Sequence, residues 1–212
     1  MSTYLVKEVF LTLQGEGAHA GRPAVFCRFT GCNLWTGREE HRASAVCRFC
    51  DTDFVGTDGP GGGRFRGAAA LAAHVRCFWP GDGRGFVVCT GGEPTLQLDD
   101  ELVEAFHGAD LEVAIETNGT RVPPPGIDWV CLSPKAGADV VLERADEVKL
   151  VFPQVEPEAA PERWVDFPAT VHSLQPMDGP DRAANTAAAV AYCLEHPAWR
   201  LSVQTHKHLG IP

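Results

Sequence analysis

The sequence predicts an α/β fold: an incomplete barrel of mainly parallel strands with few helices. Apolar runs of strand length alternate with helical segments along the chain, and polar clusters follow five of those runs. Only three segments have a convincing helical pattern, too few to surround a complete barrel. With 212 residues and 44% hydrophobic content, the chain can bury one sizeable core, so we expect a single domain over 1–212.

The predicted strands are apolar runs bounded by turn-forming residues. They cover residues 4–12, 24–30, 85–89, 111–115, 127–132, 147–152, 169–174 and 199–203. The predicted helices are 66–78, then 99–108, which opens with acidic residues, and 182–196, which Pro197 ends. The glycine-rich stretch GTDGPGGG at 56–63 predicts a flexible surface loop that is too short to separate two domains.

Polar clusters stand where five of these strands end. They read TGGEP, ETNGT, SPK, QPMD and QTHKH. The carboxyl ends of parallel strands line the ligand site of barrels and open sheets, so we expect the clusters to share one polar mouth. Ordinary polar loops would account for one or two such clusters more easily than for five.

Charge and hydropathy narrow the class of partner. A formal net charge of -10 leaves little excess of Lys and Arg to neutralise phosphates, which disfavours a nucleic-acid partner and favours a small-molecule substrate. No run approaches the ~20 apolar residues that span a bilayer, and we expect no membrane partner and no signal segment. The expected location is cytoplasmic, where the eight cysteines are kept reduced and serve as metal ligands or buried side chains.

Three cysteines gather in the stretch GCNLWTGREEHRASAVCRFCDT. Two residues separate Cys47 from Cys50, whereas fourteen separate Cys32 from Cys47. Strand alternation places Cys27 on the face opposite to Arg28, which favours a buried small side chain. Three thiolates suit an iron-sulfur cluster with one open iron better than structural zinc, which usually takes four protein ligands. The spacing alone leaves a cluster, zinc and no metal all open.

A second motif, TGGEP at 90–94, ends a strand with two glycines that allow close backbone approach and a carboxylate that could bind an ammonium group. With three cysteines after an early strand and GGEP after a later one, the chain resembles the radical SAM superfamily. Further motifs resemble the 7-carboxy-7-deazaguanine synthase family of queuosine and deazapurine biosynthesis: LQGEG (13–17), FCRFTGCNLW (26–35), CDT (50–52), TGGEPTLQ (90–97), ETNGT (116–120), SPK (133–135), QPMDG (175–179) and QTHKHLGIP (204–212). Most radical SAM proteins have three residues between the first two cysteines, but some members of this synthase family resemble the present chain in carrying an expanded loop, here 33–46.

The resemblance implies a radical SAM partial barrel and a carbon-nitrogen lyase activity. The implied reaction contracts the ring of 6-carboxy-5,6,7,8-tetrahydropterin to 7-carboxy-7-deazaguanine, with release of ammonia, after a 5'-deoxyadenosyl radical abstracts hydrogen from C6. The implied cofactors are a 4Fe-4S cluster, S-adenosylmethionine and Mg²⁺. A one-electron donor such as flavodoxin and a homodimer are implied as well.

The resemblance also assigns site residues. The cluster ligands are Cys32, Cys47 and Cys50, and Thr52 is the magnesium ligand. The residues implied to bind S-adenosylmethionine are Phe49, Cys50, Asp51, Gly92, Glu93, Ser133, Pro134, Lys135, Gln175, Pro176, Met177 and Asp178. Those implied to bind the substrate are Leu13, Gln14, Gly15, Glu16, Arg28, Thr90, His206 and Pro212.

Residue chemistry supports part of the substrate set. A carboxylate accepts two hydrogen bonds from the amidine edge of a pterin, and an Arg fork suits a substrate carboxylate, so we assign Glu16 to the first and Arg28 to the second. The alternative is a Glu16–Arg28 ion pair without a ligand. The resemblance further suggests that the terminal carboxylate of Pro212 closes over the substrate.

Other assignments keep an ordinary structural alternative. Lys135 could form a surface salt bridge, Thr52 could cap a turn, and His206 could be a hydrogen-bonded structural residue. Glu116 and Asn118 could face the cofactor or belong to an ordinary turn.

Two other functions remain open from the residues: a radical SAM activase acting on a protein, and a zinc-binding interaction module using Cys27, Cys32, Cys47 and Cys50. If the cluster assignment holds, the loop 33–46 should be an ordered excursion with Trp35 packed, and the three sulfurs should converge on one cluster.

Overall fold

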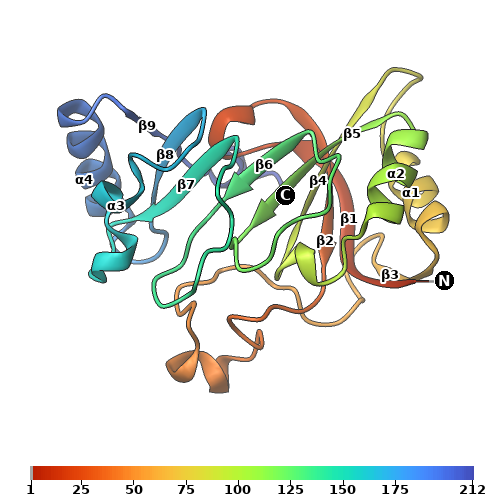
Figure 1. The fold of residues 1–212 in the computed structure, drawn as a ribbon, viewed down its shortest axis with the longest axis horizontal. Helices are drawn as coiled ribbons and strands as arrows, with labels where there is room; N and C mark the ends of the chain where they lie inside the picture. The colour runs from red at the N-terminus through yellow and green to blue at the C-terminus, as the bar shows by residue number, and fades with distance from the viewer. Residues whose placement is uncertain (1) are drawn as a thin grey trace.

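The computed structural model describes residues 2–212 and is built on one nine-stranded sheet with the order β3-β1-β2-β4-β5-β6-β7-β8-β9 (Figure 1). β2 and β4 to β9 pair in parallel, while β1 pairs antiparallel with both β2 and β3. The strands are β1 (Thr3–Leu13), β2 (Pro23–Phe29), β3 (Gly63–Arg66), β4 (Gly85–Gly91), β5 (Leu111–Thr117), β6 (Trp129–Leu132), β7 (Glu147–Phe152), β8 (Val171–Pro176) and β9 (Trp199–Leu201). The predicted incomplete, mainly parallel barrel is confirmed. The predicted single domain includes Met1, which lies outside the described residues, and it stays a prediction.

The three predicted helices are present with slightly different ends. They are α1 (Ala68–Arg76), α2 (Asp100–Gly108) and α4 (Arg182–Glu195). α2 begins where the Asp99 carboxylate accepts a hydrogen bond from the Leu102 amide at 3.0 Å, which is a normal N-cap. The short helices α3 (Pro161–Trp164) and α5 (Thr205–Leu209) were not predicted, because one turn of helix is too short to show a period. No helix within residues 2–212 is long and apolar enough to cross a membrane.

The glycine-rich stretch 56–63 differs from the prediction of a flexible surface loop. Its backbone lies along β1, where the Gly59 amide donates to the Lys7 carbonyl (3.0 Å) and the Val9 amide donates to the Pro60 carbonyl (2.8 Å). A Cβ at Gly59 or Gly62 would collide with that same Lys7 carbonyl. The glycines therefore allow close approach of two backbones, and the stretch leads directly into the unpredicted edge strand β3.

The two faces of the sheet carry different kinds of side chain. Apolar side chains on the outer face pack against α1 and α2 at one end of the sheet and against α3 and α4 at the other (Figure 1). Cys27 belongs to this outer core and is fully buried, as strand alternation predicted. The inner face carries polar side chains near the carboxyl ends of the strands, so the site described below forms there.

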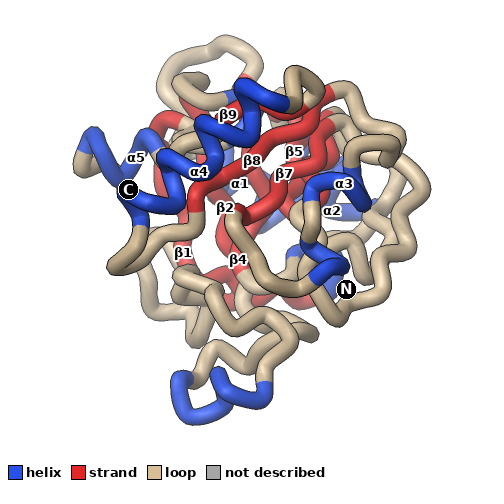
Figure 2. Tube along the Cα trace, turned by 90° about the vertical axis from the view of Figure 1, so that its left-hand side faces the viewer, coloured by secondary structure: helices blue, strands red, loops and turns tan. Residues whose placement is uncertain are grey.

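The cysteine-loop insertion 33–46 forms a separate lobe. Its short 3-10 helix η2 (Glu39–Ser44) projects away from the sheet in both views of the backbone (Figures 1 and 2). Trp35, Ala45 and Phe54 form a small apolar core inside the lobe, with the rings of Trp35 and Phe54 edge to face at 5.6 Å. The expectation of an ordered excursion with Trp35 packed is confirmed.

Candidate active site

A cavity of about 510 Å³ opens on the inner face of the sheet. All five polar clusters that follow strands contribute to its lining, as the shared polar mouth predicts. They supply Thr90, Gly91, Gly92, Glu116, Thr117, Asn118, Ser133, Lys135, Gln175, Pro176, Met177, Asp178, Gln204, His206 and Lys207.

The structure brings almost every predicted site residue to this one cavity. Besides the predicted members of the strand-end clusters, the lining includes Leu13, Gln14, Gly15, Glu16, Arg28, Cys32, Cys47, Phe49, Cys50, Asp51, Thr52 and Pro212. Glu93 and Pro134 do not line it, because both are buried behind its wall. Whether each lining residue binds a ligand stays a prediction.

Glu93 ties two strand ends together. Its side chain is fully buried, with 0% exposure. One carboxylate oxygen accepts from the Thr117 hydroxyl at 2.8 Å and from Thr95, and the other accepts from the Asn118 amide at 2.8 Å. These bonds join the TGGEP segment to the ETNGT segment, so Glu93 shapes the wall from behind.

The three candidate cluster ligands lie together at the end of the cavity beside the insertion. A hydrogen bond from the Cys47 thiol lowers the pKa of Cys50 to about 6, and burial raises the pKa of Cys32. Charge on Cys32 and on Cys50 also raises the pKa of Cys47, after the larger effects of the Cys50 hydrogen bond and burial. The three thiols are thus close enough to influence one another, as a shared cluster requires.

A zinc site is not supported by this arrangement. Cys27 lies on the outer face of the sheet, away from the cavity, and burial raises its pKa well above the ordinary value. Within residues 2–212 no group of three or more His, Cys, Asp or Glu side chains converges closely enough to hold a single ion. Thiolates that bind different irons of one cluster need not meet at one point, so the three cysteines fit a cluster better than zinc.

Two features of the wall fit a bound polar cofactor. A Cβ at Gly92 would collide with the Gly31 carbonyl and touch Cys32, so glycine lets the TGGEP backbone pass directly beside a candidate cluster ligand. The Gln175 side-chain oxygen is buried and has no hydrogen-bond partner within residues 2–212. A buried acceptor of this kind is costly unless a donor from a ligand or water meets it.

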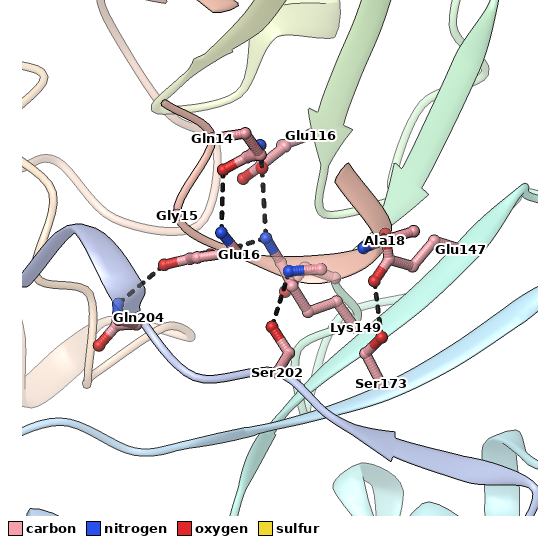
Figure 3. A network of polar contacts seen from close by, with 12 residues as sticks. Gln14, Gly15, Glu16, Ala18, Glu116, Glu147, Lys149, Ser173, Ser202 and Gln204 are labelled. Carbon is pink, nitrogen blue, oxygen red and sulfur yellow. Dashed lines mark hydrogen bonds and ion pairs between the residues drawn. The ribbon is translucent and has the colours of Figure 1, made fainter. Parts of the chain in front are cut away.

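The floor of the cavity is a buried charge network centred on Lys149 (Figure 3). The Lys149 side chain is buried, and its Nζ donates to Glu16 Oε2 at 2.7 Å and to Glu116 Oε1 at 3.2 Å. Gln204 Nε2 donates to the other Glu16 oxygen at 2.9 Å, and Gln14 Nε2 donates to Glu116 Oε1 at 3.1 Å. The network therefore joins residues near both ends of the chain, Gln14, Glu16 and Gln204, to the strands β5 and β7.

The network fixes the charges of its members. Burial opposes ionisation of Glu16, but the Lys149 charge and the hydrogen bonds from Lys149 and Gln204 outweigh it and lower its pKa to about 2. Burial likewise acts to lower the pKa of Lys149, yet Glu116 and Glu16 hold it well above its ordinary value. Two carboxylates thus face one ammonium group.

A second layer holds the Glu16 backbone in place. The 3-10 helix η1 (Gly17–His19) follows Glu16 directly, and the Ala18 amide donates to the buried Glu147 carboxylate at 3.0 Å. The Gly17 amide donates to the Ser202 hydroxyl at 2.7 Å (Figure 3). These bonds leave the position of Glu16 little freedom.

Arg28 also lines the cavity, and it pairs with a residue that we did not predict. Its Nε donates to Glu8 Oε1 at 2.7 Å, whereas Glu16 pairs with Lys149. The Glu16–Arg28 ion pair considered as an alternative is therefore wrong. Within residues 2–212 the two terminal nitrogens of Arg28 make no hydrogen bond, so both remain available to a ligand.

The rim of the cavity is formed by the C-terminal segment. Lys207 of α5 donates to Asp51 and to Asp178, both at 2.7 Å, and so bridges the cysteine loop and the loop after β8. His206 packs against Gly15, where a Cβ would collide with its ring. The Thr12 hydroxyl donates to the Pro212 carbonyl at 2.9 Å, which places the chain end on β1 at the cavity.

Lys135 and three charged residues that the sequence analysis did not single out also line the cavity. Lys135 bonds to the carbonyl and hydroxyl of Ser133 and has no salt bridge within residues 2–212, so the surface salt bridge considered for it is wrong. Charged lining residues missed by the sequence reasoning are Glu8, Asp53 and Lys149. Lys149 carried a signal, since a lysine inside the apolar run EVKLVF must face either solvent or a partner.

An incomplete parallel barrel whose strand ends and three cysteines share one cavity defines a radical SAM domain, and residues 41–173 match the family model of the Radical SAM superfamily. A relative named 7-carboxy-7-deazaguanine synthase from Caulobacter vibrioides is 63% identical over 212 residues, covering 99% of this chain and 100% of the relative. The chain belongs to the 7-carboxy-7-deazaguanine synthase family.

Other relatives agree. A 7-carboxy-7-deazaguanine synthase from Burkholderia multivorans is 59% identical over 211 residues, covering 99% of this chain and 100% of the relative. A crystal structure of QueE from Escherichia coli superposes with a TM-score of 0.72 at 30% identity, covering 95% of this chain and 94% of that one. These similarities extend over the whole chain, so the activase and zinc-module alternatives are not supported.

Proposed function

We propose that the chain contracts the ring of 6-carboxy-5,6,7,8-tetrahydropterin to 7-carboxy-7-deazaguanine and releases ammonia. The observation that carries this proposal is the single cavity, which joins the three cysteines at one end to a carboxylate network and an arginine fork at the other. Family membership supplies the reaction, and the cavity offers groups that match both ends of the substrate.

The residues present fit a 4Fe-4S cluster and S-adenosylmethionine. Cys32, Cys47 and Cys50 would hold the cluster, while Gly92 and the acceptor of Gln175 would meet the cofactor beside it. The remaining proposed cofactor contacts are Phe49, Asp51, Ser133, Lys135, Pro176, Met177 and Asp178, all of which line the cavity. When bound, this pair supplies a 5'-deoxyadenosyl radical that removes hydrogen from C6 of the pterin. The small apolar core of the insertion packs against Cys32 and Cys50 and limits access of water to them.

The substrate would lie between Glu16 and Arg28. Glu16 and Glu116 together carry one more negative charge than Lys149 neutralises, so the floor favours a ligand edge rich in N–H donors, such as the amidine edge of a pterin. The free nitrogens of Arg28 would bind the substrate carboxylate. Leu13, Gln14, Gly15, Thr90, His206 and Pro212 would complete the substrate pocket.

Magnesium would bind at Thr52. This residue lines the cavity two positions after Cys50, and Mg²⁺ takes oxygen ligands from protein, substrate and water together. Omitting Mg²⁺ should therefore lower turnover without lowering iron content.

The proposed partners rest on the family resemblance. They are a one-electron donor such as flavodoxin and a second copy of the chain in a homodimer. We also propose a cytoplasmic location.

The function is tested by anaerobic reconstitution with iron and sulfide, followed by reduction and incubation with S-adenosylmethionine and 6-carboxytetrahydropterin, with and without Mg²⁺. We expect 7-carboxy-7-deazaguanine and ammonia in equal amounts. Protein that binds a full cluster but forms no 7-carboxy-7-deazaguanine would refute the proposed reaction.

A short C-terminal extension should weaken substrate binding. The Pro212 end of the chain is held at the cavity by Thr12, and an added Gly-Ser would remove the terminal carboxylate from that place. A charge-assisted contact contributes about 1.5 to 3 kcal/mol, so we expect KM to rise about tenfold or more. The measurement is steady-state kinetics, with the same two residues added before Met1 as the control. An unchanged KM in the C-terminal variant would count against the role of the chain end.

A further inference from the structure

The insertion between Cys32 and Cys47 reaches back to the turn that carries the other two cysteines. Arg42 in η2 donates from one terminal nitrogen to the Arg48 carbonyl at 2.8 Å and to the Cys50 carbonyl at 3.0 Å. Its guanidinium thus bonds to two backbone oxygens of the segment CRFC. One side chain of the insertion therefore spans the turn that presents Cys47 and Cys50.

The Arg42 side chain is itself held on two further sides. Its guanidinium carbon lies 4.2 Å from the centre of the Trp35 ring, and its Nε donates to both Glu39 carboxylate oxygens at 2.7 and 2.8 Å. Trp35 is packed on Phe54 and donates from its indole nitrogen to the Arg38 carbonyl at 3.2 Å. These contacts hold the guanidinium in one position, from which it bonds to the Cys47–Cys50 turn.

The long spacing between cysteines makes such a support necessary. A longer loop between two ligands raises the entropy that is lost when both bind one centre. The insertion offsets this loss with its own apolar core, and its two ends are closed by the Val46 amide donating to the Leu34 carbonyl at 3.1 Å. The Cys47–Cys50 turn lies outside this apolar core, and Arg42 ties two of its carbonyls to the insertion.

We propose that Arg42 is a positioning residue for the iron-sulfur cluster: through the Arg48 and Cys50 carbonyls it fixes the Cys47–Cys50 turn in the conformation that binds iron. This inference rests on the proposed function, since it needs a cluster on these cysteines. Arg42 itself does not line the cavity and acts through Trp35 and the Cys47–Cys50 turn.

The test compares Arg42→Ala and Arg42→Lys with the matched control Arg38→Ala. Arg38 lies in the same insertion, is exposed, and has only a distant ion pair with Glu40 at 3.8 Å. Each protein is reconstituted anaerobically, and we measure iron and sulfide content and the rate at which an iron chelator removes the cluster. Outer-shell changes cost about 10- to 100-fold in metal affinity, so we expect Arg42→Ala to lose iron about tenfold faster than wild type, and Arg38→Ala to match wild type. Arg42→Lys keeps the charge but has one nitrogen, which cannot bond to the Glu39 carboxylate and to the two turn carbonyls in the fixed geometry of the guanidinium, so we expect it to resemble Arg42→Ala in the chelation rate.

A second readout separates positioning from general destabilisation. Loss of a nearby positive charge disfavours the reduced cluster, so Arg42→Ala should have a more negative reduction potential, while its thermal unfolding without iron stays close to wild type. Arg42→Ala that keeps both the potential and the chelation rate of Arg38→Ala would overturn the inference and leave the proposed function intact. Wild-type protein that takes up no cluster at all would overturn the proposed function, and this inference with it.

A deletion variant extends the test of the Arg42 substitutions. It lacks eleven insertion residues, which restores the common spacing of three residues between the first two cysteines. It removes Arg42 together with the apolar core, and we expect little or no cluster to survive chelation. Full, stable cluster binding in the deletion variant would overturn the inference.

Discussion

Replacing Cys47 by alanine is expected to abolish both cluster binding and turnover. Only three cysteines line the cavity within residues 2–212, so a cluster that loses one of them has no replacement thiolate. After anaerobic reconstitution, iron and sulfide should fall to the level of nonspecific binding, and 7-carboxy-7-deazaguanine should fall to background. The same outcome is expected for Cys32→Ala and Cys50→Ala.

The matched control for this experiment is Cys27→Ala. Cys27 is close to the motif in sequence but buried in the outer core, so its loss should lower thermal stability through a small cavity while iron content stays at the wild-type level. Iron or zinc binding that depends on Cys27 as strongly as on Cys47 would contradict the assignment of the cluster ligands.

Replacing Lys149 by methionine is expected to destabilise the protein strongly. Lys149 is 4% exposed, and its loss would leave the largely buried Glu16 and the partly buried Glu116 carboxylates without their common cation. Removing one partner of a buried ion pair costs about 3 to 5 kcal/mol, because the other partner is left uncompensated. Urea unfolding monitored by circular dichroism measures this loss, and the variant should also bind the pterin poorly.

The double variant Lys149→Met/Glu116→Gln is the control. It restores the original net charge of the network and should recover part of the lost stability. If Lys149→Met alone unfolds at the wild-type urea concentration, the network does not have the electrostatic role assigned to it.

The same network predicts a pH dependence. The pKa of Glu16 is lowered from 4.5 to about 2 in the folded protein, so its contribution to stability is present above pH 4.5 and is lost as the pH falls toward 2. Without Lys149 the main cause that lowers this pKa is gone and burial, which raises it, remains. In Lys149→Met this acid loss should therefore disappear, and acidification that protonates Glu16 should instead relieve part of the destabilisation.

Two kinds of feature could be predicted from sequence: the alternation of side chains along a strand, and the polar residues at strand ends. Cys27 could be assigned to the core because alternation along β2 fixes which face it occupies, and the structure confirms this. The cavity could be predicted because parallel strands end at one edge, which brings QPMD and TGGEP together although they are far apart in sequence. Packing of Trp35 followed from reading the insertion as an ordered excursion.

The features that could not be predicted are pairings between distant residues. Glu16 and Lys149 are 133 positions apart, and nothing local indicates which carboxylate a strand lysine will meet. The same holds for Glu93, whose carboxylate is satisfied by the neighbouring strand end, although its motif suggested a side chain open to a ligand. The 56–63 stretch was misjudged because glycine signals flexibility in a sequence and close backbone packing in this fold.

The most direct test of the central claim follows the hydrogen at C6. The claim is that one cavity holds the radical-generating cofactor against the pterin that Glu16 and Arg28 position. The reconstituted enzyme is incubated with S-adenosylmethionine and 6-carboxytetrahydropterin carrying deuterium at C6, and both products are examined by mass spectrometry. The account predicts 7-carboxy-7-deazaguanine together with 5'-deoxyadenosine that has gained deuterium. Formation of 7-carboxy-7-deazaguanine with unlabelled 5'-deoxyadenosine would contradict it.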